Sequence, residues 1–184
     1  MKLVLCSASP RRRELLERVG VSFSVAPSHI DETQHPGESA IQYVRRMAIE
    51  KAEPSLKPGQ VALAADTIVV VDGEVLGKPR DRSDAHRMLS LLSGREHKVI
   101  TAVCVNDAVR EVETSVRFAS LSAGQLRFLV DSGDGDDKAG AYALQGVAGA
   151  FVTEIDGSFS NVIGLPMPET LEMLAQAGVE LPWT

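Results

Sequence analysis

The sequence predicts an α/β fold with a mixed sheet, and three stretches lead to this prediction. A short apolar run at residues 3–6 is typical of a buried strand, and Ser9 and Pro10 then suit the start of a helix. The near-continuous apolar run at residues 61–71 favours a central strand covered on both faces. Asp72-Gly73 follows directly and predicts a tight hairpin.

Apolar periodicity and turn residues predict the remaining elements. Further strands are expected at residues 23–26, 74–76, 98–105, 109–118, 151–155 and 161–164. After the helix that begins at Pro10, further helices are expected at residues 38–52, 83–93, 122–130 and 166–177. In the helix at 38–52 we expect Ile41, Val44 and Ala48 to form the inner face.

Composition narrows the class of protein. A chain of 184 residues with 44% hydrophobic and 24% charged residues suits one domain over residues 1–184, or two tightly joined lobes. The net charge of −6 argues against a nucleic acid polymer as partner. No apolar run is long enough to cross a membrane, and we do not expect the first residues to form a signal peptide. We therefore expect a cytoplasmic protein in which Cys6 and Cys104 are buried thiols.

Three arginines begin the first helix, where acidic residues are normally favoured. Arg11, Arg12 and Arg13 would each cost about 0.3–1 kcal/mol at this helix end unless an anion lies in front of it. Such an anion would be held by backbone N–H groups, by the arginines and by the hydroxyls of Ser7 and Ser9. The alternative is a solvated basic turn whose arginines pair with nearby carboxylates.

Two charged residues interrupt apolar surfaces. Asp66 lies inside the run at 61–71, so its carboxylate must be paired, hydrated or bound to a metal; a structural aspartate bonded to local N–H groups is the alternative. Lys51 points within about 20° of Val44 on the same helix. It could extend past the helix end, offset the helix dipole or reach an anion.

Three other stretches could supply site residues. Asp31-Glu32 lies in a turn-rich loop, where metal-binding or catalytic groups are often found, although these two residues by themselves favour a solvated acidic loop. Gly77-Lys78-Pro79 lacks the spacing and hydroxyl of a phosphate-binding P-loop, but the hairpin should return Lys78 toward Asp66. Gln145 lies in a stretch of small residues that would allow a ligand close to the backbone.

An ordered set of short segments resembles one family, the Maf nucleoside triphosphate pyrophosphatases. The matching segments run through the whole chain: residues 7–12 (Ser-Ala-Ser-Pro-Arg-Arg), 31–32, 50–52, 65–67, 77–79, 93–94, 101–103, 138–142, 145–146 and 164–166. The resemblance implies a long curved mixed sheet with flanking helices and two lobes around a central cleft. It also implies hydrolysis of a nucleoside triphosphate between the α- and β-phosphates, giving a monophosphate and pyrophosphate.

The resemblance also implies roles for individual residues. Asp66 matches the proton acceptor, and the other active-site positions match Ser7, Arg11, Arg12, Glu32, Lys51, Lys78 and Gln145. The family needs a divalent cation, Mg²⁺ or alternatively Mn²⁺, which Glu32 with Asp66 could hold. Members commonly form homodimers, and the family name records an effect on bacterial septation.

Within this family the motifs are similar to the subgroup that acts on dTTP and UTP. Two residues are expected to select a pyrimidine base: Thr67, which follows Asp66, and Gln145, which lies in the Gly-rich stretch. Two alternatives stay open: the 7-methyl-GTP subgroup, and a nucleotide-binding regulator of septation without catalytic activity.

Overall fold

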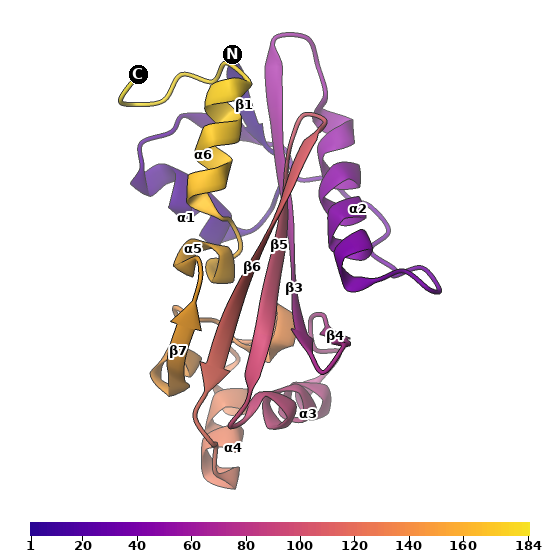
Figure 1. Ribbon diagram of the computed structural model, residues 1–184, viewed down its shortest axis with the longest axis vertical. Helices are drawn as coiled ribbons and strands as arrows, with labels where there is room; N and C mark the ends of the chain where they lie inside the picture. Colours follow the sequence, from indigo (N-terminus) through magenta and orange to yellow (C-terminus); the bar gives the residue numbers. More distant parts are fainter. The chain divides into compact units, whose positions relative to one another are not determined.

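The computed structural model describes residues 1–184 and contains a seven-stranded mixed sheet with flanking helices (Figure 1). The strand order is β2-β1-β3-β5-β6-β7, and β4 pairs with β3 off this path. β1 is parallel to both β2 and β3, whereas the β3–β4 and β6–β7 pairs are antiparallel. The mixed α/β prediction is therefore confirmed.

The elements follow the expected order with shifted boundaries. The strands are β1 (Lys2–Leu5), β2 (Phe23–Val25), β3 (Gln60–Val71), β4 (Glu74–Leu76), β5 (Glu96–Val105), β6 (Ala108–Phe118) and β7 (Val152–Asp156). The helices are α1 (Pro10–Arg18), α2 (Ala40–Ala52), α3 (Arg82–Leu92), α4 (Ala123–Ser132), α5 (Phe159–Ile163) and α6 (Met167–Gln176). No helix has both the length and the apolar character needed to cross a membrane.

The chain divides into two compact units. The first comprises residues 1–66, 101–112 and 164–184, and the second comprises residues 67–100 and 113–163. Strands β3, β5 and β6 each contribute residues to both units. The cleft implied by the family resemblance and the single domain over residues 1–184 stay predictions.

Unit one forms its core around β1 and β3, with α1, α2 and α6 contributing buried side chains. Leu5 and Leu63, which are register partners of the parallel β1–β3 pair, are 1% and 0% exposed. Leu16 of α1 and Met47 of α2 are fully buried. Cys6 and Cys104 are also buried free thiols, as expected.

Unit two has its own hydrophobic core, formed by β3, β4, β5 and β6 with α3, α4 and the turn at residues 139–142. Helix α3 packs on α4 and on the short 3₁₀ turn Ala139–Ala141. At its centre the His97 ring stacks on Phe118 and meets the Tyr142 ring edge-on, with ring centroids 5.6 and 5.4 Å away. His97 Nε2 lies 2.8 Å from the Tyr142 hydroxyl.

Two local predictions are wrong. Residues 161–164 do not form a strand, because Phe159–Ile163 is the short helix α5, and Asn161 bonds from it to Val99 O and Thr114 Oγ1. Ile41 is 51% exposed because the first turn of α2 extends beyond the part of the helix that packs on the core. The inner face instead contains Val44, Met47, Ala48 and Ala52.

The buried histidine predicts a pH-dependent stability. Burial lowers the pKa of His97 from its ordinary value of 6.5 to about 4. Between these two values the unfolded chain binds a proton that the folded chain does not, so acid favours unfolding. We expect the free energy of unfolding to fall by about 2 kcal/mol from pH 7 to pH 5 through this residue. Urea unfolding at pH 7, 6 and 5 measures the free energy of unfolding at each pH.

The control for this prediction is an exposed histidine. His97→Asn should flatten the slope of stability against pH, whereas His86→Gln on the surface of α3 should retain it. An unchanged slope in the His97 variant would show that other groups cause the acid sensitivity.

Candidate active site

The turn between β1 and α1 carries the first group of site residues. The Ser7 hydroxyl oxygen accepts hydrogen bonds from Ser9 N at 3.2 Å and from Arg12 Nη1 at 3.1 Å. Ser9 is the N-cap residue and Pro10 is the first helical residue, as predicted, but the Ser9 side chain makes no capping bond. The first turn contains no acidic residue. Ser7 therefore organises the turn and at the same time orients Arg12.

Arg12 also binds a backbone group that is distant in the sequence. Its Nε donates to the Gly164 carbonyl at 2.8 Å, although the two residues are 152 positions apart. Burial lowers the pKa of Arg12, and the neighbouring charges of Asp66 and Glu32 act in the opposite direction. The Asp66 and Glu32 carboxylates, which belong to the same unit, therefore stabilise the positive charge of Arg12.

Arg11 supports the anion interpretation of this turn. Its Nε is buried and has no hydrogen-bond partner, and burial lowers the pKa of its guanidinium. A buried unpartnered donor is costly unless a ligand satisfies it. For Arg11 this favours an anion in front of α1 over a nearby carboxylate partner, whereas Arg12 interacts with the charges of Asp66 and Glu32.

Lys51, Asp66 and Glu32 form the second group. Lys51 Nζ lies 2.6 Å from Asp66 Oδ1 and 2.9 Å from Glu32 Oε1. The Lys51 and Asp66 side chains are only 12% and 13% exposed, whereas that of Glu32 is 46% exposed. The positive charge of a lysine from α2 thus offsets the negative charge of Asp66. Lys51 does not extend past the helix end into solvent but joins two carboxylates.

The predicted residues of unit two lie around the β3–β4 hairpin and the small-residue stretch. Lys78 follows β4, is exposed and forms no ion pair. The preceding Gly77 carbonyl accepts from Gly140 N at 3.1 Å, which ties the stretch to the hairpin. Gly140 has φ +71°, and a Cβ there would lie 3.0 Å from the Val69 side chain, so the backbone fits closely.

Thr67 and Gln145 differ in their surroundings. Thr67 is half-buried in β3 and directly follows Asp66. Gln145 is exposed, in a turn where Val147 N donates to Asp134 Oδ2 at 2.9 Å. Asp134 belongs to the acidic segment 131–137, which therefore helps to shape the turn that carries Gln145.

Sequence reasoning missed three contributors in unit one. The Gly164 carbonyl anchors Arg12, and the only signal for it was its place in a matching segment. Tyr43 and Arg46 of α2 bind the loop that carries Glu32, through hydrogen bonds to the Glu32 and Thr33 carbonyls. Their positions three residues apart on one helix were the signal that could have revealed them.

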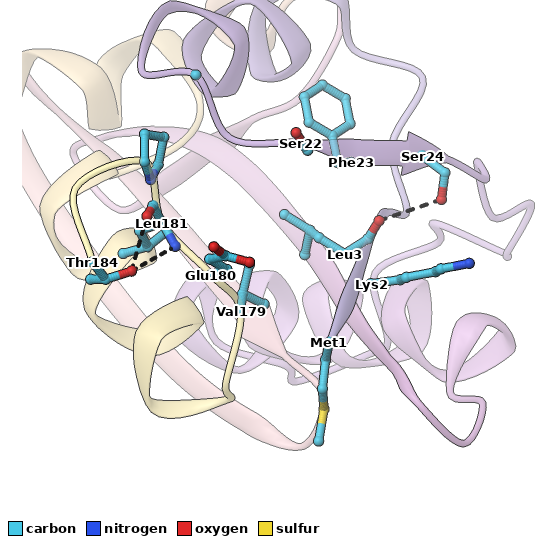
Figure 2. A pocket seen from close by; sticks show the side chains of 12 residues that line it. Met1, Lys2, Leu3, Ser22, Phe23, Ser24, Val179, Glu180, Leu181 and Thr184 are labelled. Carbon is cyan, nitrogen blue, oxygen red and sulfur yellow. Dashed lines mark hydrogen bonds between the residues drawn. The ribbon is translucent and has the colours of Figure 1, made fainter.

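A cavity of about 640 Å³ lies elsewhere in unit one, beside the chain ends (Figure 2). Met1, Lys2, Phe23 and Leu181 are among its lining residues, and it contains none of the predicted site residues. In this region Ser24 Oγ donates to Leu3 O, and the Thr184 hydroxyl bonds to Leu181.

Comparison with known proteins agrees with these features. The Maf-like protein family matches residues 2–177. The chain is 54% identical to a dTTP/UTP pyrophosphatase of Anaeromyxobacter sp. (strain Fw109-5), over 99% of this chain and 92% of the relative. It is 50% identical to a dTTP/UTP pyrophosphatase of Myxococcus xanthus, over 98% of this chain and 95% of that protein. A dTTP/UTP pyrophosphatase of Symbiobacterium thermophilum is 49% identical, with 96% and 94% covered. The chain therefore belongs to the Maf-like protein family.

Proposed function

We propose that this protein hydrolyses dTTP and UTP between the α- and β-phosphates, releasing a nucleoside monophosphate and pyrophosphate. The observation that carries the proposal is the largely buried Lys51–Asp66 ion pair beside Glu32, in the unit where Arg12 projects from α1. Relatives about half identical over nearly the whole chain are named dTTP/UTP pyrophosphatase, which favours these substrates over 7-methyl-GTP.

The cations would neutralise the triphosphate. A nucleoside triphosphate carries close to four negative charges, and hydrolysis requires stabilisation of the pyrophosphate that leaves. Arg11 presents an unpartnered guanidinium Nε, and Arg12 is pre-oriented by Ser7. We assign both arginines, with Lys51 and Lys78, to the phosphates.

Asp66 is assigned to the attacking water. Its carboxylate can accept a proton from water, and Lys51 Nζ orients it from 2.6 Å away. The ion pair also fixes the carboxylate rotamer, so little reorganisation is needed when the substrate arrives. We propose that Asp66 acts as general base at the α-phosphorus.

We assign a divalent cation to Glu32. The Glu32 and Asp66 carboxylates both lie at Lys51 Nζ, which occupies the position between them, and Glu32 is the more exposed of the two. No group of three or more His, Cys, Asp and Glu residues that could hold a metal is present. Mg²⁺ commonly binds one or two carboxylates together with substrate phosphates, and Mn²⁺ accepts similar ligands. Glu32 would hold the ion, which would offset phosphate charge, and Asp66 stays available to accept the proton.

Base selection is assigned to Thr67 and Gln145. A pyrimidine such as thymine or uracil presents two carbonyl acceptors on either side of an N–H donor, and the Gln145 amide offers both a donor and an acceptor. The Thr67 hydroxyl and methyl group directly follow the general base in β3. Buried polar atoms left unpaired by a wrong base cost about 1–3 kcal/mol each, which is enough for discrimination.

A substrate panel tests the proposal. With Mg²⁺, we expect kcat/KM for dTTP and UTP to exceed that for 7-methyl-GTP, ATP and GTP by about tenfold or more, as one unpaired polar group implies. Chromatography should identify the monophosphate and pyrophosphate as products. Preference for 7-methyl-GTP would overturn the choice of base, and binding without turnover would overturn the proposed reaction.

A further inference from the structure

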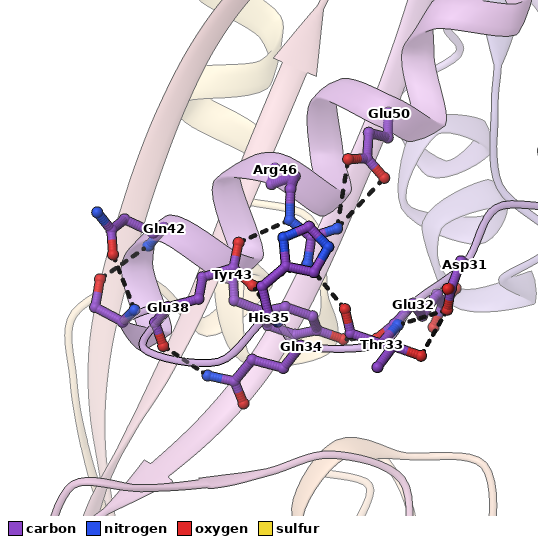
Figure 3. Close-up of polar contacts among 11 residues, drawn as sticks. Asp31, Glu32, Thr33, Gln34, His35, Glu38, Gln42, Tyr43, Arg46 and Glu50 are labelled. Atoms are coloured by element: carbon purple, nitrogen blue, oxygen red, sulfur yellow. Dashed lines mark hydrogen bonds and ion pairs between the residues drawn. The ribbon is translucent and has the colours of Figure 1, made fainter.

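Two successive carbonyl groups of the loop before α2 are each held by a side chain of that helix (Figure 3). The Tyr43 hydroxyl donates to Glu32 O at 2.8 Å, and Arg46 Nη2 donates to Thr33 O at 2.9 Å. The Arg46 guanidinium also lies 5.7 Å from the centroid of the Tyr43 ring. The backbone at residues 32–33 is thus fixed to the same helix that carries Lys51.

Arg46 closes the loop at its other end through Glu38. Its Nε and Nη2 bind the two carboxylate oxygens of Glu38 at 2.7 and 2.8 Å, in the bidentate geometry that suits a guanidinium. The Arg46 and Glu38 side chains are 19% and 10% exposed, so solvent screens this pair less than an open surface pair. His35 N also donates to Glu38, and Glu50 lies 3.4 Å from Arg46 on the next turn.

These contacts restrict the position of the Glu32 carboxylate. Residues 31–38 form no helix or strand, and the Glu32 side chain is 46% exposed, so local structure alone does not fix it. Each loop residue left free would carry a conformational entropy of about 1–2 kcal/mol that must be lost on binding. With both carbonyls held, Glu32 Oε1 already lies 2.9 Å from Lys51 Nζ.

We infer that Arg46 and Tyr43 are positioning residues, which clamp residues 31–38 onto α2 and thereby hold the Glu32 carboxylate against Lys51 and Asp66. The inference rests on the proposed function, because the clamp matters for catalysis only if Glu32 holds the metal ion during hydrolysis. Neither residue contacts the reacting atoms in this account. Both act through the backbone of Glu32 and its neighbour.

Conservative variants separate the clamp from simple charge. Arg46→Lys retains a cation but loses the planar fork, and Tyr43→Phe removes only the hydroxyl. The matched control is Arg45→Lys. Arg45 immediately precedes Arg46 on α2, but it pairs with Glu111 at 2.5 Å, away from the loop. Amide hydrogen exchange of residues 31–35 should accelerate about tenfold in both clamp variants. It should not change in the control.

Kinetics then test whether the clamp acts through Glu32. In Arg46→Lys, kcat/KM should fall and the Mg²⁺ concentration for half-maximal rate should rise, each by about tenfold, as for other residues that support a metal ligand. In a Glu32→Gln background the same substitution should have no further effect. An equal loss in both backgrounds, or behaviour like that of Arg45→Lys, would overturn the inference.

The two proposals fail in different ways. A wild-type protein that releases no pyrophosphate would refute the proposed function, and hydrogen exchange alone would then decide whether the clamp holds the loop. Normal wild-type turnover with unchanged exchange in the Arg46 and Tyr43 variants would refute the clamp and leave the proposed function standing.

Discussion

Replacing Asp66 with asparagine is expected to lower kcat for dTTP by about 10²–10⁴-fold, the usual contribution of a general base. Asparagine has nearly the same shape, but its amide cannot take a proton from water at neutral pH. Lys51 would keep Glu32 as its carboxylate partner at 2.9 Å, so the fold and nucleotide affinity should change little. Pyrophosphate release at saturating substrate measures kcat, and a non-hydrolysable analogue measures affinity.

The control for Asp66 is another aspartate of the same unit. Asp107→Asn changes an exposed residue in the turn between β5 and β6 and should leave kcat unaltered. If the Asp66 variant kept more than about a tenth of the wild-type kcat, the general-base role would be excluded. An increased Mg²⁺ requirement with little loss of maximal rate would assign Asp66 to the metal instead.

Replacing Lys51 with methionine is expected to reduce kcat/KM by about 10²-fold, comparable with the loss of one preorganised group that stabilises transition-state charge. The variant also removes the ammonium that lies between Asp66 and Glu32, so the two carboxylates lose the cation that they share. We therefore expect a lower Tm in the absence of ligand. Steady-state kinetics and thermal unfolding measure the two effects.

Lys57→Met is the matched control, because Lys57 is an exposed lysine in the loop before β3. It removes the same charge from the same unit without touching the carboxylates and should alter neither quantity. A Lys51 variant that matched this control in both kcat/KM and Tm would show that the ion pair matters for neither catalysis nor stability.

The sequence predicted site residues where a charged side chain occurred on an apolar element, or where its charge was unfavourable at a helix end. Asp66 in an apolar strand and Lys51 on an apolar helix face each indicated a partner, and the structure pairs them at 2.6 Å. The arginines at the start of α1 likewise indicated an anion, and Arg11 retains an unsatisfied buried Nε. Such residues can be recognised because burial without compensation is costly.

Contacts to backbone atoms could not be predicted in the same way. The Gly164 carbonyl that binds Arg12 and the Glu32 carbonyl that binds Tyr43 have no side-chain signature. The strand expected at residues 161–164 is wrong, because four residues of sequence Asn-Val-Ile-Gly are too few to distinguish a strand from a helix. Asn161 belongs to a helix there and makes tertiary hydrogen bonds to β5 and β6, which a local pattern does not encode. The roles of Lys78 and Gln145 stay predictions.

The most direct measurement of the central claim is the site of oxygen incorporation. Hydrolysis of dTTP in H₂¹⁸O, followed by ³¹P NMR or mass spectrometry of both products, identifies the phosphorus that water attacks. Attack at the α-phosphorus, with Asp66 accepting the proton, places the label in dTMP and leaves the pyrophosphate unlabelled. Label in the pyrophosphate, or release of orthophosphate and dTDP, would contradict the account.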